Sequence, residues 1–245
     1  MEFAAPLFTG VFCSLFLCAV IAAPLGYFRM PITPAAVESE AEEDDIMLLF
    51  SASEDVPDPV LEYFRNEEYR EWVIDFFTGL CSNREIAEAV LGNSDEFDVP
   101  PALAFALCWE ESRFNPNAVN RQNRDGSVDR GLFQLNNRSF PNLDLLMFYS
   151  VDSNARSGIG HLRQCLDSGG SEISALAMYN AGTGRVKSTG APEVTLNYIS
   201  RILENRRKIE SRFHSRLIRE EESRMTEKTD AAPQFNRALM TASPQ

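Results

Sequence analysis

The sequence predicts a mainly helical domain with one short β-hairpin, and two observations in residues 99–136 carry this prediction. The first part of this stretch repeats apolar residues at helical spacing and ends that stripe in a carboxylate. The second part contains Asp125-Gly126, a dipeptide typical of a tight hairpin turn, followed by an alternating return strand over 127–132. The other apolar patterns between residues 61 and 224 are helical in period, so we expect helices to dominate the fold.

The central helix is expected to begin at Pro100-Pro101 and to end before Pro116. Proline is tolerated in a first helical turn because its missing N–H has no partner there, whereas Pro116 cannot continue the helix. Leu103 and Leu107 share a stripe with Glu111. We therefore expect Glu111 on the core side near the helix end, where partial burial raises the pKa of a carboxyl, as a general acid requires. A buried structural carboxylate is the open alternative.

Three short motifs follow one another from the end of this helix onward, and a tyrosine, Tyr198, comes after them. They are Glu111-Ser112-Arg113-Phe114-Asn115-Pro116-Asn117-Ala118, Gly131-Leu132-Phe133-Gln134-Leu135-Asn136 and Met178-Tyr179-Asn180-Ala181-Gly182. In this order they resemble the SLT family of bacterial lytic transglycosylases, over about residues 99–207. The hairpin at 125–131 is longer than in the commonest SLT form and is more similar to the secretion-associated branch and to c-type lysozymes. The resemblance implies a lysozyme-like helical domain of the goose-type/SLT class, with the hairpin bordering the cleft.

The resemblance also implies an activity on peptidoglycan glycan strands. Glu111 would protonate the leaving oxygen of the β-1,4 bond between N-acetylmuramic acid and N-acetylglucosamine. The same carboxylate would then act as a base on the muramic C6 hydroxyl, which closes onto C1 to give a 1,6-anhydro end. The side chains implied to orient Glu111 or to bind substrate are Ser112, Gln134, Asn136, Tyr179, Asn180 and Tyr198.

Asp129 keeps a second hypothesis open. It resembles the hairpin aspartate of lysozymes, where a glutamate in an apolar pocket is the acid and the aspartate stays ionised. Retaining glycosidases use two such carboxylates, so a hydrolytic muramidase that uses Glu111 and Asp129 is one alternative. Asp129 could equally be a turn residue that hydrogen-bonds the hairpin backbone. A catalytically silent, peptidoglycan-binding scaffold is the third hypothesis.

The N-terminal part has a different composition. Residues 1–29 are predicted to be a signal sequence or a membrane anchor, because the run 4–28 is apolar and long enough for either. We therefore expect export to the periplasm or cell envelope, with anchoring in the inner membrane as the alternative to cleavage. Residues 30–60 are predicted to be an acidic, disordered linker, since the stretch 30–64 holds ten acidic and no basic residues of a chain with formal charge −13. A partner in the envelope machinery, bound through the linker or the tail, is the alternative to a solvated spacer.

The segment 61–95 is predicted to be a helical prefix. Its first helix, over 61–78, is expected to end at Gly79. The capping-box pattern Ser82-Asn83-Arg84-Glu85 is expected to open a second helix that closes at Gly92. The aromatic residues of the prefix recur at helical spacing, so we expect them to be core residues rather than a platform for sugars.

The SLT domain itself is predicted to occupy residues 96–212. After the hairpin, Ser153 and Ser171 are expected to cap two helices. A last helix is expected over 195–224, so that residues 213–245 comprise its end and a flexible tail.

Histidine and cysteine usage weighs against several other classes of site. The chain has two histidines, so a histidine-based metal centre or a Ser-His-Asp triad is poorly supplied, and we predict no cofactor and no metal. One of them, His161, is interpreted as helix surface or packing. After the leader, Cys81, Cys108 and Cys165 show no disulfide framework. Nucleic-acid binding is not expected, because no basic patch with interleaved aromatic residues occurs.

Overall fold

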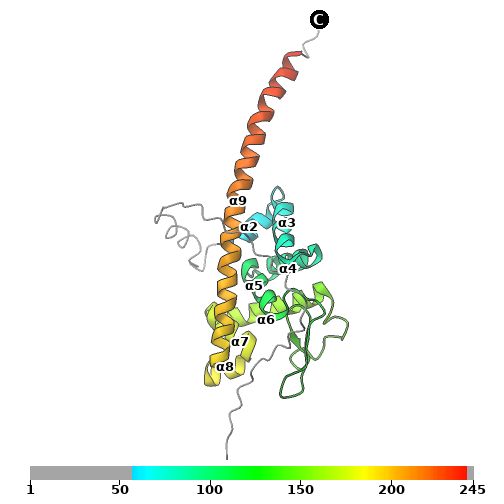
Figure 1. Ribbon diagram of the computed structural model, residues 1–245, viewed down its shortest axis with the longest axis vertical. Helices are drawn as coiled ribbons and strands as arrows, with labels where there is room; N and C mark the ends of the chain where they lie inside the picture. The colour runs from blue at the N-terminus through cyan, green and yellow to red at the C-terminus, as the bar shows by residue number, and fades with distance from the viewer. Residues whose placement is uncertain (1–56, 242–245) are drawn as a thin grey trace, which may run out of the picture. The chain divides into compact units, whose positions relative to one another are not determined.

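The computed structural model describes the backbone of residues 57–241 and the side chains of residues 57–226, so the predicted leader and nearly all of the acidic linker lie outside the described residues. The described part is mainly helical with a small antiparallel sheet, which confirms the predicted fold class (Figure 1). Its elements are α2 (Pro59–Arg65), α3 (Arg70–Cys81), α4 (Arg84–Phe97), α5 (Pro101–Ser112), β1 (Val119–Asn120), β2 (Asp129–Arg130), β3 (Leu135–Asn136), α6 (Val151–Gly169), α7 (Glu172–Ala181), α8 (Thr183–Thr189) and α9 (Glu193–Thr241).

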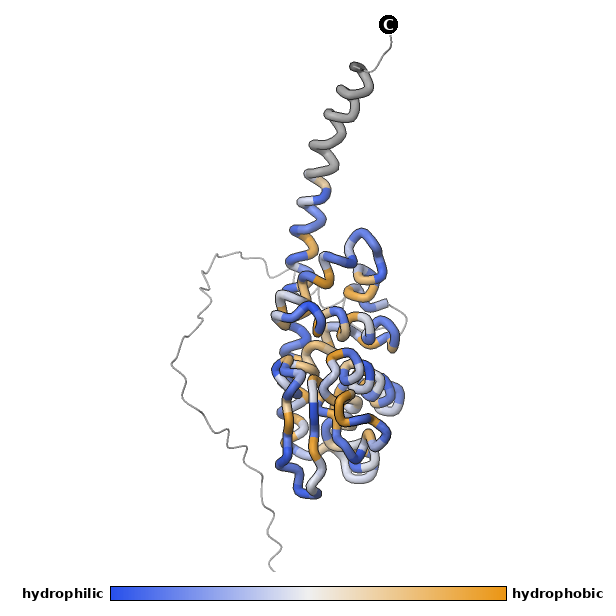
Figure 2. The backbone as a smooth tube through the Cα atoms, turned by 90° about the vertical axis from the view of Figure 1, so that its right-hand side faces the viewer, coloured by the Kyte–Doolittle hydropathy of each residue, from blue (hydrophilic) through white to orange (hydrophobic). Residues whose placement is uncertain are grey.

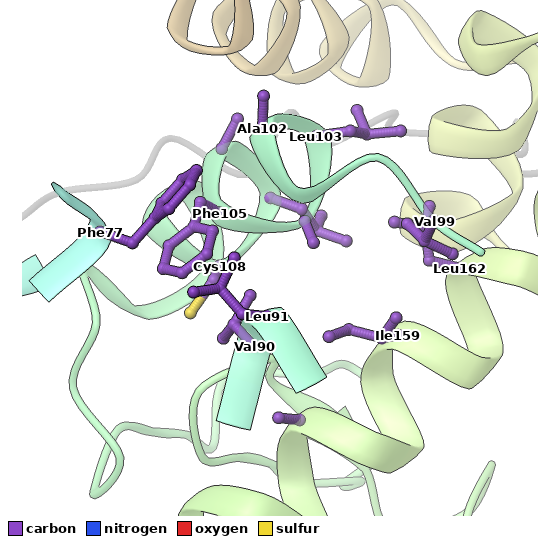
Figure 3. Packing of buried hydrophobic residues seen from close by; sticks show 14 of the residues in the cluster. Phe77, Val90, Leu91, Val99, Ala102, Leu103, Phe105, Cys108, Ile159 and Leu162 are labelled. Carbon is purple, nitrogen blue, oxygen red and sulfur yellow. The ribbon is translucent and has the colours of Figure 1, made fainter. Parts of the chain in front are cut away.

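Helix α5 lies at the centre of the hydrophobic core. All residues from Ala102 to Cys108 are fully buried, so this helix is apolar on every side rather than along one stripe. Figure 3 shows its residues packed among side chains of α3, α4 and α6. Phe105 of α5 stacks on Phe77 of α3 with ring centroids 4.3 Å apart. This packing fixes the position of the helix end that carries Glu111.

The predicted helix over 61–78 is wrong in its extent, because the structure divides it into α2 and α3. The break lies at Asn66, whose backbone is extended and whose side-chain oxygen accepts a hydrogen bond from the N–H of Glu68. An asparagine that binds nearby backbone in this way competes with helix formation. Helix α3 then passes through Gly79 and ends at Cys81, with Ser82 in the left-handed region at φ 57°.

Helix α4 begins one residue later than the capping-box pattern suggests and ends later than Gly92. The cap is Asn83, whose side-chain oxygen accepts a hydrogen bond from the N–H of Ile86. The helix continues through Gly92 to Phe97 because Val90, Leu91, Asn93 and Ser94 are buried on both sides of this glycine. This packing outweighs the cost of a single interior glycine, about 1 kcal/mol.

The predicted hairpin is part of a three-stranded antiparallel sheet with the order β1-β2-β3. Asp129 on the central strand pairs with Asn120 on one side and with Asn136 on the other. The return strand shortens to Asp129–Arg130 because Gly131 turns the chain with φ 78°. A side chain there would collide with Asn154 of α6, since a Cβ on Gly131 would lie 2.2 Å from its Nδ2 atom.

The N-terminal caps of helices α6 and α7 agree in part with those predicted from the sequence. Ser171 caps α7 as predicted, but α6 is capped by Ser150, whose hydroxyl accepts a hydrogen bond from the N–H of Ser153. Helix α9 continues to Thr241, whereas an irregular tail was expected after residue 224. The stretch 225–241 contains Pro233 but no glycine, and it includes strong helix formers such as Glu, Lys and Ala.

Helix α9 joins the prefix helices to the core. Phe213 is buried, and its ring lies 5.3 Å from Trp72 and 5.2 Å from Phe76, centroid to centroid. The hydroxyl of Tyr63 donates a hydrogen bond to Glu221 at 2.8 Å. The prefix aromatics are therefore core residues, as predicted.

The hydropathy of the described helices decides whether any of them could span a membrane. In Figure 2, the coloured part of α9, up to residue 226, is mostly hydrophilic, with hydrophobic residues only at intervals along it. Between residues 57 and 241, no helix combines the length and the apolar character needed to cross a bilayer.

We predict that Phe213→Ala destabilises the domain by about 3–5 kcal/mol, because it leaves a cavity among the aromatic rings of α2 and α3. Urea unfolding measures this loss. Ile218→Ala on the same helix is the control, because Ile218 is 44% exposed, and its loss should be less than about 1 kcal/mol. Equal losses for the two variants would contradict the described packing.

Candidate active site

A polar cleft of about 530 Å³ lies beside the end of α5. Its walls come from that helix end, the sheet region, α6 and the end of α7. The structure brings six of the predicted site residues to this cleft, namely Glu111, Asp129, Gln134, Asn136, Tyr179 and Asn180.

Glu111 lies in the last turn of α5 and is partly buried at the cleft. Its Oε1 atom accepts a hydrogen bond of 2.5 Å from the hydroxyl of Tyr198. Burial raises the pKa of the Glu111 carboxyl from 4.5 to about 8, the hydrogen bond from Tyr198 opposes this rise, and the charges of Asp129 and Glu110 add to it. Glu111 therefore holds a proton at neutral pH, and Oε2, the oxygen that Tyr198 does not engage, is the atom available to donate it.

Tyr198 and Ser112 were both expected to orient Glu111 or to bind substrate, but the structure places the two residues differently. Tyr198 comes from α9, where burial and the charge of Glu111 raise the pKa of its phenol well above 10, so it remains a hydrogen-bond donor. Ser112 is buried, and its hydroxyl donates to the carbonyl of Cys108 within α5 at 3.2 Å. Ser112 thus contributes to the helix end and does not line the cleft.

Asp129 is held by three asparagine side chains. The Nδ2 atom of Asn136 donates to Oδ1 at 2.7 Å, while the Nδ2 atoms of Asn120 and Asn123 donate to Oδ2 at 3.0 and 2.9 Å. Both carboxylate oxygens therefore act as acceptors in a polar setting. Asn136, predicted as a sugar contact, is also engaged with Ser127, so the structure gives it a role in positioning Asp129.

Gln134 presents a side-chain oxygen at the cleft. Its Nε2 atom donates to the backbone carbonyls of Ala118, at 3.2 Å, and Gly131, at 2.9 Å. Its backbone has φ 45°, a conformation that is uncommon for a residue with a side chain. This turn conformation and the two hydrogen bonds fix the direction of the amide, leaving Oε1 as an acceptor for a ligand.

Tyr179 and Asn180 lie in the last turn of helix α7 and line the cleft. The hydroxyl of Tyr179 donates to the carbonyl of Phe133 at 3.0 Å, which ties α7 to the segment between β2 and β3. The side-chain oxygen of Asn180 accepts a hydrogen bond of 2.9 Å from the hydroxyl of Thr195. The amide nitrogen of Asn180 is then a donor available at the cleft.

His161 is a cleft residue that the sequence does not reveal. It packs as expected, with its ring 5.0 Å from that of Tyr179 and 5.8 Å from that of Phe140, and it also lines the cleft. Burial lowers the pKa of the His161 imidazole below 6.5, so the ring is neutral at pH 7. No local motif marks His161, because its place at the cleft depends on how α6 packs against α7.

The cysteines in the described part of the chain do not form a reactive or bridged site. Cys81, Cys108 and Cys165 are free thiols. Burial raises the pKa of the Cys108 thiol, which disfavours the nucleophilic thiolate form. Among the described residues, no group of three or more His, Cys, Asp or Glu side chains is arranged to hold a metal ion.

The helical fold and a cleft with a protonated glutamate define a lysozyme-like domain. Comparison with protein-family models matches residues 88–199 to the transglycosylase SLT domain. Residues 88–199 therefore match the SLT family of lytic transglycosylases, a family that acts on peptidoglycan, and the match confirms the resemblance found in the sequence motifs.

Curated relatives match a larger part of the chain. The invasion protein IagB of Salmonella typhimurium strain SL1344 is 28% identical over 136 residues, which are 53% of this chain and 82% of the relative. The invasion protein IagB of Salmonella typhi matches with the same identity and coverage.

We predict that Glu111→Gln stabilises the fold increasingly as the pH rises. Because the folded-state pKa of this carboxyl, about 8, lies above its usual value of 4.5, its contribution to stability is complete below pH 4.5 and is lost as the pH rises through 8. Glutamine avoids that loss, so the variant should gain on the order of 1–3 kcal/mol over the wild type between pH 5.5 and pH 9.

Urea unfolding of both proteins at the two pH values measures this gain. Glu85→Gln, at an exposed site in the first turn of α4, is the matched control. A difference between the wild type and Glu111→Gln that is the same at both pH values would contradict a raised pKa for Glu111.

Proposed function

We propose that this protein is a peptidoglycan lytic transglycosylase. It cleaves the β-1,4 bond between N-acetylmuramic acid and N-acetylglucosamine and leaves a 1,6-anhydromuramic end. The observation that carries this proposal is the state of Glu111, a carboxyl that keeps its proton at neutral pH, accepts a hydrogen bond from Tyr198 and lies at a polar cleft.

The reaction uses Glu111 twice. Its protonated carboxyl first donates to the bridging oxygen, so that the C1–O bond breaks and N-acetylglucosamine leaves with a new hydroxyl. The carboxylate then removes the proton of the muramic C6 hydroxyl, whose oxygen forms the new bond to C1. The acid is thereby regenerated and no water is consumed, which is why one carboxylate with a pKa above neutrality suits both steps.

The remaining cleft residues bind and orient the sugars. Gln134 offers an acceptor and Asn180 offers a donor, the two functions that hydroxyl and acetamido groups require. Tyr179 supplies an aromatic surface whose hydroxyl is already bound to backbone. The Tyr198 hydroxyl remains hydrogen-bonded to Glu111 and holds it in one orientation.

A hydrolytic muramidase is the second candidate, and Asp129 is the observation in its favour. Asp129 lines the same cleft as Glu111, and its charge contributes to the raised pKa of the Glu111 carboxyl. Two carboxylates in such different settings are the pattern of a retaining glycosidase, in which the second is a nucleophile. In this candidate Asp129 attacks C1 and water releases the product. A silent scaffold that binds peptidoglycan is the third.

The proposal includes location and partners. Peptidoglycan as substrate requires export to the periplasm or cell envelope, and the apolar N-terminal run, as a signal or an inner-membrane anchor, supports it. Because the curated relatives are named invasion proteins, we extend the proposal to a partner in the envelope machinery. The acidic linker at 30–60 and the C-terminal tail are the segments offered for that contact.

Mass spectrometry of muropeptides released from purified peptidoglycan tests the function. We predict that the wild type releases fragments one water lighter than hydrolysed fragments. Glu111→Gln should release at least about 100-fold fewer, the usual contribution of a general acid or base.

The second arm is Asp129→Asn, which keeps the shape of the side chain. Hydrated reducing ends from the wild type, lost in Asp129→Asn, would replace the proposal with the muramidase. Binding to peptidoglycan without any products would leave the scaffold.

A further inference from the structure

A second carboxylate lies immediately beside Glu111 in the chain and is not part of the cleft lining. The side chain of Glu110 is only 7% exposed. Its Oε1 atom lies 2.6 Å from a guanidinium nitrogen of Arg201 and accepts a hydrogen bond of 2.7 Å from the Nε atom of the same residue. A buried charge of this kind is costly unless it is paired, so the pair needs an explanation.

Pairing of Glu110 is incomplete on its other side. The Oε2 atom is buried without a hydrogen bond, and its ionic partner is Arg113 at 3.6 Å. Arg113 is more than half exposed and also stacks over Trp109, with its guanidinium carbon 4.7 Å from the ring centroid. Arg201 is therefore the main counter-charge of Glu110.

The position of Arg201 connects this pair to the acid. Arg201 follows Tyr198 by three residues on α9, and residues three apart lie on one face of a helix. Glu110 precedes Glu111 on α5. The two helices are thus joined twice at adjacent positions, by the hydrogen bond from Tyr198 to Glu111 and by the ion pair from Arg201 to Glu110.

From this geometry we infer that Arg201 and Glu110 are positioning residues for the acid Glu111. Their ion pair holds the end of α5 against α9 in the register that places the Tyr198 hydroxyl on Glu111. Arg201 also neutralises the carboxylate of Glu110, whose negative charge at the adjacent position of α5 raises the pKa of Glu111. The inference rests on the proposed function, because it assigns these residues a role at the same acid.

The other ionisable groups around Glu111 are the same in the wild type and in variants at positions 110 and 201. Tyr198 faces it from α9, Tyr179 from α7 and Asp129 from β2. The charged or titratable side chains that line the same cleft besides these are Asp125, Arg138 and His161.

The two charges of the pair have opposite effects on the pKa of the Glu111 carboxyl, so the two single variants are expected to shift this pKa in opposite directions. Glu110→Gln removes a negative charge near Glu111, so the pKa of the Glu111 carboxyl should fall. Arg201→Gln leaves Glu110 without its main counter-charge, so the pKa should rise. We expect each shift to be about half a unit or more, and the double variant to lie between the two single variants.

A carboxyl ¹³C NMR titration of the full chain, labelled on glutamate, measures the pKa without requiring turnover. The Glu111 signal is the one that is absent from the spectrum of Glu111→Gln. Lys208→Gln is the matched control, because it removes one cation from α9 at an exposed pair with Glu204, and it should leave the pKa unchanged. Arg201→Lys keeps the charge and should stay near the wild type, so it tests the same point should Arg201→Gln fail to fold.

The pH dependence of anhydro-product release provides the second readout. The high-pH limit of activity should move down in Glu110→Gln and up in Arg201→Gln, parallel to the titration. A pair that acted only through helix packing, with no effect of its charges on Glu111, would give shifts of the same sign in both single variants and no recovery in the double variant, and that result would overturn the inference.

The two readouts separate this inference from the proposed function. Opposite shifts in the titration without anhydro products from the wild type would remove the proposed function and retain the link between the pair and Glu111. Anhydro products together with shifts of one sign would retain the function and overturn the inference.

Discussion

The hydrogen bond between Tyr198 and Glu111 is the contact on which the site depends, because it joins two helices that are far apart in the chain. Glu111 lies in the last turn of α5, whose residues Ala102–Cys108 are fully buried, and Tyr198 stands near the start of α9, 87 residues later. A carboxyl at the end of a core helix loses solvation, which raises its pKa, and the Tyr198 phenol, whose pKa is raised well above 10, stays protonated at neutral pH and restrains the direction of that carboxyl. The core therefore supplies both the protonation state and the orientation of the acid.

The second carboxylate of the cleft shows how local surroundings separate two similar groups. Asp129 lies on the central strand of the sheet and accepts hydrogen bonds from the amides of three asparagines. Glu111 accepts a single hydrogen bond at the end of an apolar helix. The carboxylate of Asp129 is thus held by three donors, whereas that of Glu111 has one donor and is desolvated by burial. This contrast follows from where the sheet and α5 meet.

The features that depend on a local sequence pattern were predicted from the sequence. The position of Glu111 at the end of a buried helix followed from apolar spacing and Pro116, and the Asp125-Gly126 turn followed from its composition. Features that depend on packing between distant segments were missed. His161 joins the cleft through the contact of α6 with α7, and Arg201 meets Glu110 across α5 and α9. Helix ends at Gly79 and Gly92 were wrong because burial of neighbouring residues outweighed the weak helix propensity of glycine.

The central claim is that the cleft holds a glycosidic bond against the free oxygen of Glu111. A crystal structure of Glu111→Gln with a bound peptidoglycan fragment tests it most directly, because the variant keeps the shape of the side chain and stops turnover. The account predicts that the bridging oxygen between N-acetylmuramic acid and N-acetylglucosamine lies about 2.6–3.2 Å from the side-chain amide at position 111. A fragment bound in the cleft with its bridging oxygens away from this position, or bound on another surface, would contradict the account.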